Sequence, residues 1–367
     1  MKSFIYANKD PLPIIVHVVR RYGRVGGMET YVWNLTHGLV RSGINVAVVC
    51  EEVFGEPSGH IEICLAEKTH HKRRWRAMLG FRASVQIAIE SHFRGREFIV
   101  HSHERSLNHQ ITTFHGPPIR AAASFSLVDR LNPRIRAWQR MELNEVSSDS
   151  VQMVLPVSHQ IRKALATNYP GIAEKRVLVA WPGVDTNQNH SYGAASNEAQ
   201  PPKFLFVGKE WKRKGLDLAI RLVTRYQRQI DAEAILDVYG PLESDLPRAL
   251  RSSPIANFKG WRDEIPWEQY SALIHPARQE PFGMVVAEAR QQGIPVLVSK
   301  QVGAAEVGFD GVVTIDFTES LDAQIEDLKQ MIHDPALKCP EVKWSWDDLV
   351  ELHLTEVYPS VGFGGLE

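Results

Sequence analysis

The sequence has few cysteines and no long apolar run. Its three cysteines, Cys50, Cys64 and Cys339, stand at unrelated spacings without a CxxC pair, so they indicate neither a disulfide framework nor a zinc site. We interpret them as buried thiols. No apolar run approaches the roughly 18 residues that span a bilayer, and the N-terminal MKSFIYANKDPLP lacks the apolar stretch of a secretory signal. These absences predict a cytoplasmic protein.

The charged residues are unevenly distributed, although the net charge is only −1. Residues 61–140 contain 14 Lys and Arg against 6 Asp and Glu, which leaves the rest of the chain acidic. A basic region favours an anionic partner: nucleic acid, a phosphorylated acceptor or an anionic membrane. Few aromatic residues interleave these charges and no RNP-type motif is present, so the sequence predicts no nucleic-acid partner.

The length and the apolar pattern predict two domains. A chain of 367 residues is longer than the roughly 250 to 300 residues that a single core usually organises. Short runs rich in Val and Ile alternate with helical patterns, which is typical of parallel strands covered on both faces. The predicted strands are 13–19, 44–50, 97–103, 111–116, 151–158, 176–181, 203–208, 234–240, 256–260, 272–277, 295–299 and 311–316.

A polar segment, 187–203, ends in Pro-Pro and Lys and predicts a linker between the domains. We therefore predict an α/β fold with two Rossmann-like, doubly wound domains, 1–186 and 200–343. Residues 344–360 have the pattern of an amphipathic helix with Asp near its start, and we expect it to pack back on the first domain. Open α/β folds bind ligands at the carboxyl ends of their strands, so chemically important motifs should follow strands.

Two glycine-containing motifs do follow predicted strands. In RYGRVGGMET, Gly27 allows a close approach of the backbone to a ligand at a helix N-terminus. This motif lacks the GxGxxG and GxxxxGK[ST] patterns, so an ordinary turn stays open. In FVGKEWKRKGLD, Lys209 ends a strand and Lys214 opens a helix, which predicts two ammonium groups near a phosphate. A solvated basic loop is the alternative.

A third motif, QEPFGMVVAEA, turns a strand into a helix and contains two glutamates eight positions apart. Glu288 has apolar neighbours, so its carboxylate needs donors such as ribose hydroxyls, whereas Glu280 should face a sugar. For either glutamate alone, stabilisation by the helix dipole is an alternative. Free amides at the turn favour a phosphate or sugar hydroxyl. The residues predicted to bind the ligand through this turn are Phe282, Gly283, Met284 and Val285.

With GGMET, SHQIRKAL, WPGVD, FVGKEWKRKGLD and EPFGMVVAEARQQGIPVLVS in this order, the sequence resembles the retaining glycosyltransferases of family 4 over nearly its whole length. Their GT-B architecture has two facing Rossmann-like domains. The resemblance implies that Glu288 holds the ribose of a nucleotide sugar and that Glu280 contacts the transferred sugar. Lys209, which replaces an Arg of many members, and Lys214 would bind the diphosphate together with the Gly27 amide.

The resemblance also places a histidine, His115 of TTFHGPP, beside the sugar and the acceptor. A hydrogen-bonded histidine at a strand end is the alternative. His101, His103, His109 and His115 lie within fifteen residues, which raises the question of a metal. The sequence lacks both HExxH and the DxD triplet of metal-dependent glycosyltransferases. We therefore predict no metal and no cofactor, with the nucleotide sugar as substrate. After GAAEV the sequence departs from the family pattern, which affects only the edge of the second domain.

The resemblance implies transfer of a sugar with retention of configuration, by front-face displacement assisted by the leaving phosphate. Fixed charges and helix amides would stabilise the departing diphosphate. We predict a UDP-hexose as donor and, as acceptor, a lipid-linked, phosphorylated glycan of the lipopolysaccharide core. Two alternatives stay open: a nucleotide-sugar epimerase or glycan phosphorylase of the same fold, and a non-catalytic protein that binds nucleotides or anions.

The segment KTHHKRRWRAMLGFR, 68–82, surrounds Trp75, Met78, Leu79 and Phe81 with basic residues, which is typical of an interfacial helix. More basic residues follow between 130 and 140. We therefore predict peripheral association with the anionic inner face of the cell membrane. The alternative is a solvated basic helix that packs its aromatic residues inward.

Overall fold

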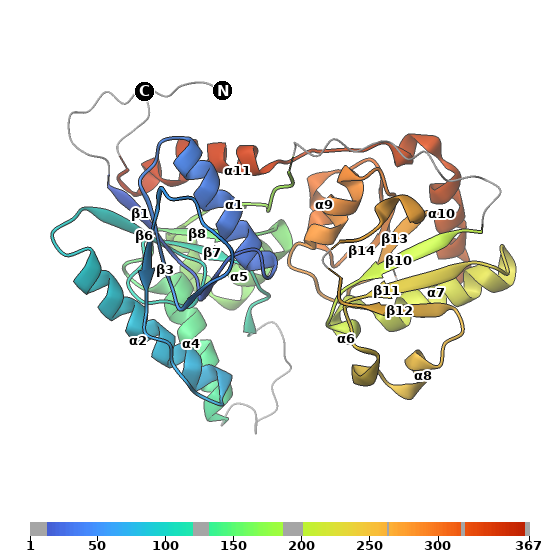
Figure 1. Ribbon diagram of the computed structural model, residues 1–367, viewed down its shortest axis with the longest axis horizontal. Helices are drawn as coiled ribbons and strands as arrows, with labels where there is room; N and C mark the ends of the chain where they lie inside the picture. The colour runs from blue at the N-terminus through green and yellow to red at the C-terminus, as the bar shows by residue number, and fades with distance from the viewer. Residues whose placement is uncertain (1–12, 120–131, 186–200, 263, 317–319, 364–367) are drawn as a thin grey trace. The chain divides into compact units, whose positions relative to one another are not determined.

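The computed structural model describes residues 13–119, 132–185, 201–262, 264–316 and 320–363 (Figure 1). The chain divides into two compact units. The N-terminal unit comprises Met1–Gly183 together with Trp346–Glu367, and the C-terminal unit comprises Val184–Ser345. Most of the predicted linker, 187–203, lies outside the described residues.

The N-terminal unit contains a parallel sheet with the strand order β5-β3-β1-β6-β7-β8-β9. The Val-rich strands β1 and β3 are almost wholly buried, as expected for a sheet covered on both faces. The strands of this sheet are β1 (Ile14–Val18), β3 (Val46–Cys50), β5 (Ile61–Leu65), β6 (Phe98–Ser102), β7 (Ile111–Phe114), β8 (Met153–Pro156) and β9 (Arg176–Val177). The short strands β2 (Arg21–Tyr22) and β4 (Glu52–Val53) pair separately.

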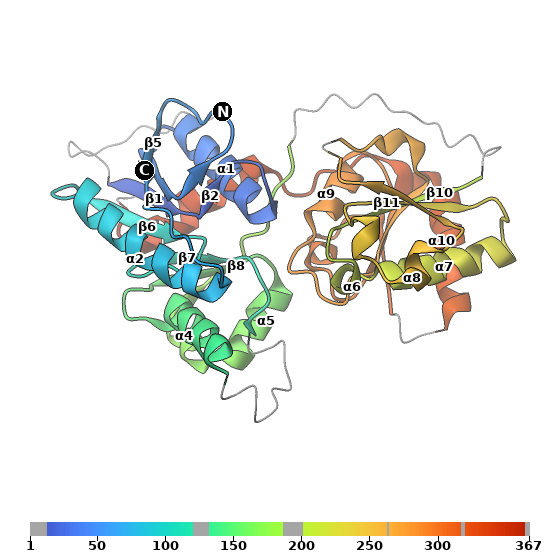
Figure 2. The ribbon, with the colours of Figure 1, turned by 60° about the horizontal axis from the view of Figure 1, so that its bottom comes forward.

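Successive side chains of β1 point to opposite faces of this sheet. Val16 and Val18 join a core with Phe81 of α2, whereas His17 of the same strand contacts Tyr358 of the C-terminal segment. Helices α2 and α4 pack together, as Figure 2 shows, and α1 packs against α11. The helices of this unit are α1 (Gly27–Arg41), α2 (Arg74–His92), α4 (Pro133–Ser147), α5 (His159–Asn168) and α11 (Trp346–Leu352).

The C-terminal unit contains a second parallel sheet with the strand order β12-β11-β10-β13-β14-β15. Helices α7 and α10 share a buried core with β10 and β11. The strands are β10 (Lys203–Val207), β11 (Ile235–Tyr239), β12 (Ala256–Gly260), β13 (Ala272–His275), β14 (Val296–Ser299) and β15 (Val312–Ile315). The helices are α6 (Trp211–Lys214), α7 (Leu216–Gln229), α8 (Arg248–Arg251), α9 (Met284–Gln291) and α10 (Leu321–His333).

These two parallel sheets with flanking helices confirm the predicted α/β fold class. The predicted strands are all present in the described part of the chain, although most are shorter than predicted and the strand predicted at 176–181 is only Arg176–Val177. The sheet also contains β5, an edge strand that was not predicted, because Glu62 interrupts its short apolar run and only Ile61 and Cys64 are buried. The short β2 and β4 were also missed.

Two further predictions need correction. The helix predicted at 344–360 is α11 followed by a π-helical turn, His353–Val357, and a 3-10 turn, Pro359–Val361. The regular helical hydrogen bonds end before Pro359, because proline has no backbone N–H to continue them. Cys339 is exposed, so only Cys50 and Cys64 are buried thiols. Among the described residues, no helix has the length and apolarity that a membrane crossing requires.

Candidate active site

In the C-terminal unit, the order of the strands brings two of the predicted motifs together. β10 pairs with β13, so the loops after these neighbouring parallel strands leave the sheet at the same edge. Lys209 lies in the loop after β10 and Lys214 at the end of the short helix α6 that follows it, and the loop after β13 contains Glu280. Gly208, with φ +155°, makes this arrangement possible, because a Cβ there would lie 2.1 Å from the Lys214 side chain.

The carboxylate of Glu280 is the centre of this cluster. Its Oε2 lies 3.0 Å from Lys214 Nζ, 3.3 Å from Arg213 Nη1 and 3.4 Å from His275 Nε2. Burial by itself would raise the pKa of Glu280, but His275 and the Lys214 ammonium outweigh burial and hold it well below its usual range. Glu280, which follows β13, is therefore an anion that fixes two cationic side chains of α6, the short helix after β10.

Lys209 and Glu288 lie differently from this cluster. The ammonium of Lys209 lies 4.1 Å from the centre of the Trp261 ring, a cation–π contact that holds this exposed side chain. Glu288 is half-buried on α9, and burial raises its pKa, although Lys214 partly opposes this. The two lysines therefore have different partners, one ammonium on an aromatic ring and the other on Glu280.

The Pro-Phe-Gly turn has the geometry that the sequence predicts for a helix start. Gly283 has φ +94°, a conformation that glycine adopts without strain. The turn is fixed to the segment after β14, because the amides of Gly303 and Ala304 donate to the carbonyls of Glu280 and Phe282 at 3.1 and 2.8 Å. The first amides of α9, including those of Met284 and Val285, have no carbonyl of their own helix to bind. They offer donors to an anionic ligand.

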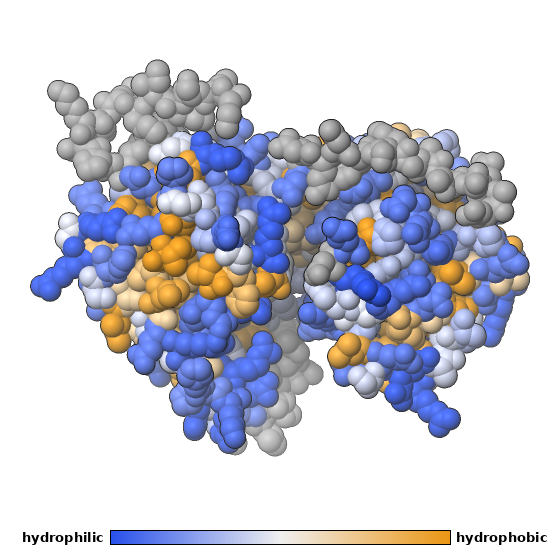
Figure 3. All heavy atoms as spheres, viewed as in Figure 1, coloured by the Kyte–Doolittle hydropathy of each residue, from blue (hydrophilic) through white to orange (hydrophobic). Residues whose placement is uncertain are grey.

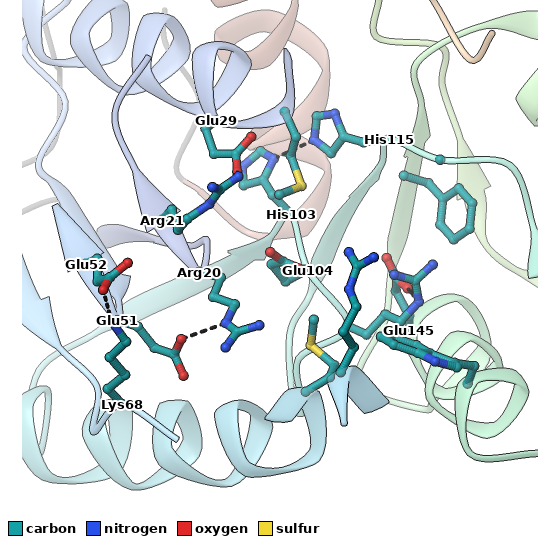
Figure 4. A pocket seen from close by; sticks show the side chains of 17 residues that line it. Arg20, Arg21, Glu29, Glu51, Glu52, Lys68, His103, Glu104, His115 and Glu145 are labelled. Atoms are coloured by element: carbon teal, nitrogen blue, oxygen red, sulfur yellow. Dashed lines mark hydrogen bonds and ion pairs between the residues drawn. The ribbon is translucent and has the colours of Figure 1, made fainter. Parts of the chain in front are cut away.

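The N-terminal unit contains a separate cavity of about 570 Å³ (Figure 4). Its side chains lie at or after the ends of β1, β3, β5, β6 and β7, or on α1, α2 and α4. Most of its cations have a carboxylate partner: Arg20 Nε lies 2.6 Å from Glu51, Arg21 Nε lies 3.0 Å from Glu29, and Lys68 pairs with Glu52. The charged residues that line this cavity are Arg20, Arg21, Glu29, Glu51, Glu52, Lys68, Arg74, Glu104, Arg105 and Glu145.

Two carboxyl groups of this cavity are buried and have shifted pKa values. Burial raises the pKa of Glu104 to about 7, although Arg105 partly opposes this. Burial likewise raises the pKa of Glu145 to about 8, against the opposing effect of Arg105, whose Nε lies 3.6 Å from Glu145 Oε2. Both groups therefore exchange protons near neutral pH, inside a cavity that can hold a small molecule.

The raised pKa of Glu145 predicts a pH-dependent stability difference. Between its ordinary value of 4.5 and about 8, the folded protein holds a proton that the unfolded chain releases. Glu145 therefore favours folding below pH 4.5 and loses this contribution as the pH rises toward 8. We expect Glu145→Gln to become more stable relative to the wild type across this range, as measured by urea unfolding at several pH values. The exposed Glu97→Gln is the control, and a pH-independent difference would refute the assignment.

His115 lies at the end of β7, at the rim of this cavity, and Gly27 is the first residue of α1. The Nε2 of His115 shares a hydrogen bond with His103 Nδ1 at 3.1 Å. Its ring also makes an edge contact with the ring of Tyr31, with 4.9 Å between the ring centres. The hydrogen-bonded strand-end histidine that the sequence left as an alternative is therefore present, in a position open to a ligand.

Sequence reasoning missed several residues of these two sites. Arg213 was considered only as part of a basic loop and His275 was not considered, although His275 ends a strand. Glu104 and Arg105 lie within three residues of the end of β6. The position after a parallel strand was the signal that could have identified them, because that edge of the sheet is where such folds bind ligands.

Comparison with known proteins agrees with this arrangement. The model of Glycosyltransferase Family 4 matches residues 25–188, and the model of Glycosyl transferases group 1 matches residues 193–342. The fold is that of WaaG, a glycosyltransferase involved in lipopolysaccharide biosynthesis, with a TM-score of 0.73 at 18% identity over 96% of this chain and 100% of that chain. The two matched domains and the fold thus define a glycosyltransferase of the GT-B fold.

The chain belongs to the GT-B glycosyltransferases, with a family 4 domain followed by a group 1 domain. It is 23% identical to a 41.2 kDa protein of the cps region of Klebsiella pneumoniae, over 78% of this chain and 81% of that protein. It is 26% identical to the D-inositol 3-phosphate glycosyltransferase of Geodermatophilus obscurus, over 79% of this chain and 74% of the relative. The predicted family is confirmed.

Proposed function

We propose that the protein transfers a hexose from a UDP-sugar to a glycan of the lipopolysaccharide core, with retention of configuration and without a metal. The observation that supports a nucleotide-sugar donor most directly is the Glu280 cluster. Lys214 and Arg213 both lie against one buried carboxylate, next to a helix start with free amides. A diphosphate needs such a set of cations and amide donors.

The chemistry follows from these residues. Breaking the anomeric bond increases the negative charge on the departing diphosphate, so charges that are already in place stabilise the transition state. In the proposal, Lys214, Lys209 and the α9 amides bind the diphosphate, Glu288 holds the ribose, and Glu280 positions Lys214 while facing the transferred sugar. Within the N-terminal unit, His115 is assigned to the acceptor and Gly27 offers its amide at the start of α1. Solved structures of the same fold include HepE of Anabaena in complex with UDP and glucose, with a TM-score of 0.60 at 16% identity over 94% of this chain.

The cavity of the N-terminal unit supports a glycan acceptor. Most of its cations are neutralised by carboxylates, so it offers hydrogen-bonding groups rather than free positive charge. Sugar hydroxyls both donate and accept, and they match such a lining. We assign the lipopolysaccharide core as acceptor because WaaG and the outer core galactosyltransferase WaaB have the same fold, WaaB with a TM-score of 0.55 at 15% identity over 94% of this chain.

A donor screen tests the proposed function. UDP-, GDP- and ADP-sugars would be compared by thermal stabilisation, because a ligand that binds the folded state raises its stability by mass action. We expect UDP-hexoses to stabilise most, and incubation with a core glycan to release UDP. If only GDP- or ADP-sugars stabilised the protein, the predicted UDP donor would be wrong. Hydrolysis or isomerisation of the sugar without transfer would contradict the transferase assignment.

The predicted membrane segment needs a partial correction. The helix begins at Arg74 rather than 68, and it buries Met78 and Phe81 against the sheet, so these side chains are not available to a membrane. Leu79 remains 41% exposed, and Leu143 of α4 is 43% exposed. A groove of about 680 Å³ between the two helices is lined by both leucines with Arg136 and Arg140.

Apolar residues gather on the face of the N-terminal unit that Figure 3 shows, with hydrophilic residues beside them. We propose that the groove between α2 and α4 rests on the anionic inner face of the cell membrane, with its leucines in the interface and its arginines on lipid headgroups. Each basic residue near an anionic surface contributes about 1 kcal/mol, so a few of them would hold the protein reversibly.

We expect the protein to sediment with anionic liposomes at low salt and to dissociate as the salt concentration rises, because the attraction is electrostatic. Replacement of Arg136 and Arg140 by Gln should reduce the bound fraction, whereas Arg248→Gln and Arg251→Gln in the C-terminal unit should not. Binding that is insensitive to lipid charge and salt, or no binding at all, would argue for an acceptor in solution.

A further inference from the structure

A chain of hydrogen-bonded side chains runs from the rim of the N-terminal cavity into the buried side of the sheet. His115 Nε2 lies 3.1 Å from His103 Nδ1, and His103 Nε2 lies 3.0 Å from His17 Nδ1. His17 Nε2 lies 3.4 Å from the hydroxyl of Tyr358, which lies 3.3 Å from His101 Nδ1. The histidine chain, as we call it, consists of His115, His103, His17, Tyr358 and His101.

Strand register and the return of the chain end assemble these residues. His17 of β1 is paired with His101 of β6, so their side chains lie side by side on one face of the sheet. His103 follows β6, and His115 follows β7. Tyr358 reaches the same face from the segment after α11, and its side chain is fully buried.

A metal ion is the competing interpretation, because one ligand atom each from His17, His101 and His103 lie within 4.8 Å of one another. The ring geometry favours the hydrogen bonds. The rings of His101 and His103 stack at 4.4 Å with planes 27° apart, and those of His17 and His103 at 5.3 Å with planes 15° apart. An imidazole binds a metal in its own ring plane, and stacked, nearly parallel rings do not aim at one point.

The histidines of the chain are neutral. Burial lowers the pKa of His17 and of His115 to about 3, and burial with the neighbouring histidines lowers that of His103 far below its ordinary value. A neutral imidazole has one N–H donor and one acceptor nitrogen. The proton position on one ring therefore determines the position on the next, so only two arrangements keep every bond from Tyr358 to His115.

These two arrangements differ at the cavity. His115 uses Nε2 in the chain, and within the described residues no partner occupies its Nδ1. In one arrangement Nδ1 is a donor, and in the other it is an acceptor. Figure 4 shows His103 and His115 pointing toward each other at the edge of the cavity. Whatever selects one arrangement therefore selects what His115 offers to a bound sugar.

We propose that His103, His17 and Tyr358 are positioning residues that couple the tautomer of His115 to the buried end of the histidine chain. The Tyr358 hydroxyl completes either arrangement, because it can donate to His17 Nε2 or accept from it. Loss of that hydroxyl favours the arrangement in which His17 Nε2 is an acceptor, because an unpaired buried N–H is the costlier alternative. This inference rests on the proposed function in one respect, namely that His115 forms a hydrogen bond with a hydroxyl of the sugar or of the acceptor. It also assigns a role to the C-terminal segment, because the hydroxyl of Tyr358 is the group that follows the three histidines counted from the cavity.

The test compares two single-oxygen deletions. Tyr358→Phe cuts the histidine chain, whereas Tyr22→Phe removes another buried hydroxyl of the same unit, one that bonds Thr36 at 2.7 Å. Two-bond ¹H–¹⁵N spectra of histidine-labelled protein report the tautomer of each ring. We expect His115 to shift toward the tautomer with its proton on Nδ1 in Tyr358→Phe, and to keep the wild-type tautomer population in Tyr22→Phe. An unchanged His115 spectrum in Tyr358→Phe would overturn the proposal, and this readout requires no substrate.

Activity gives the second readout. We expect Tyr358→Phe to lower kcat by about tenfold, the size of one misplaced hydrogen bond, with Tyr22→Phe close to the wild type. In a His115→Ala background, Tyr358→Phe should have no further effect, because it acts through that ring. An equal decrease in both backgrounds would mean that Tyr358 acts only on the structure. If Tyr358→Phe proves unstable, His17→Asn interrupts the same hydrogen-bond chain. Its amide can replace Nδ1 of His17 toward His103, but it cannot replace Nε2 toward Tyr358.

Discussion

Lys214→Ala should lower kcat/KM for the donor by roughly 10- to 150-fold, which corresponds to the loss of a charged contact of roughly 1.5 to 3 kcal/mol. Lys214 is the proposed diphosphate ligand, and its ammonium is held 3.0 Å from Glu280. Lys209→Ala should reduce activity less within this range, because the Lys209 ammonium lies on the Trp261 ring. The double variant should be nearly inactive. Steady-state kinetics with the best donor of the screen measures these effects.

Lys212→Ala is the matched control for this prediction. Lys212 lies in the same short helix, α6, but its side chain is exposed, so its removal tests whether a general loss of positive charge is enough to reduce activity. We expect nearly wild-type kinetics. Wild-type kinetics in Lys214→Ala would remove this residue from the diphosphate site. An equal loss of activity in Lys212→Ala would mean that positive charge near α6 attracts the donor without direct contact by Lys214.

Glu288→Gln should weaken binding of the donor, whereas Glu280→Gln should mainly lower kcat. A carboxylate that accepts hydrogen bonds from two ribose hydroxyls loses a charged acceptor in the first variant, which costs roughly 1.5 to 3 kcal/mol, or roughly 10- to 150-fold in Kd. The second variant removes the anion that holds Lys214, Arg213 and His275 in place. Calorimetric titration with the donor and with UDP measures binding, and turnover separates the two roles.

A 2′-deoxyribose donor provides the control. If Glu288 binds the ribose, this analogue should bind the wild type more weakly, and it should lose less affinity than the normal donor when Glu288 is replaced. Equal losses for both donors would remove Glu288 from the ribose site. Unchanged kinetics of both glutamate variants with every donor would reject the site as a whole.

The parallel sheets and the positions of the candidate ligand-binding residues were predictable from local sequence pattern. Runs of Val and Ile flanked by helical patterns define buried parallel strands, and Gly283 identifies the turn before α9 because few other residues adopt its backbone conformation without strain. The positions of Lys209, Lys214, Glu280 and Glu288 were also predictable, because each belongs to a motif that follows a predicted strand. These positions depend only on the local sequence pattern and on the order of the motifs.

Which of these side chains meet depends on the packing of the folded units. Glu280 contacts Arg213, 67 positions away, and Tyr358 reaches His101 across 257 positions, because strand order and the return of the chain end are set by packing rather than by local sequence. The same holds for the basic segment, where α2 buries Phe81 and leaves Leu79 exposed. A pattern of apolar and basic residues predicts an amphipathic helix, but the surface that covers its apolar side is settled by the core of the folded unit.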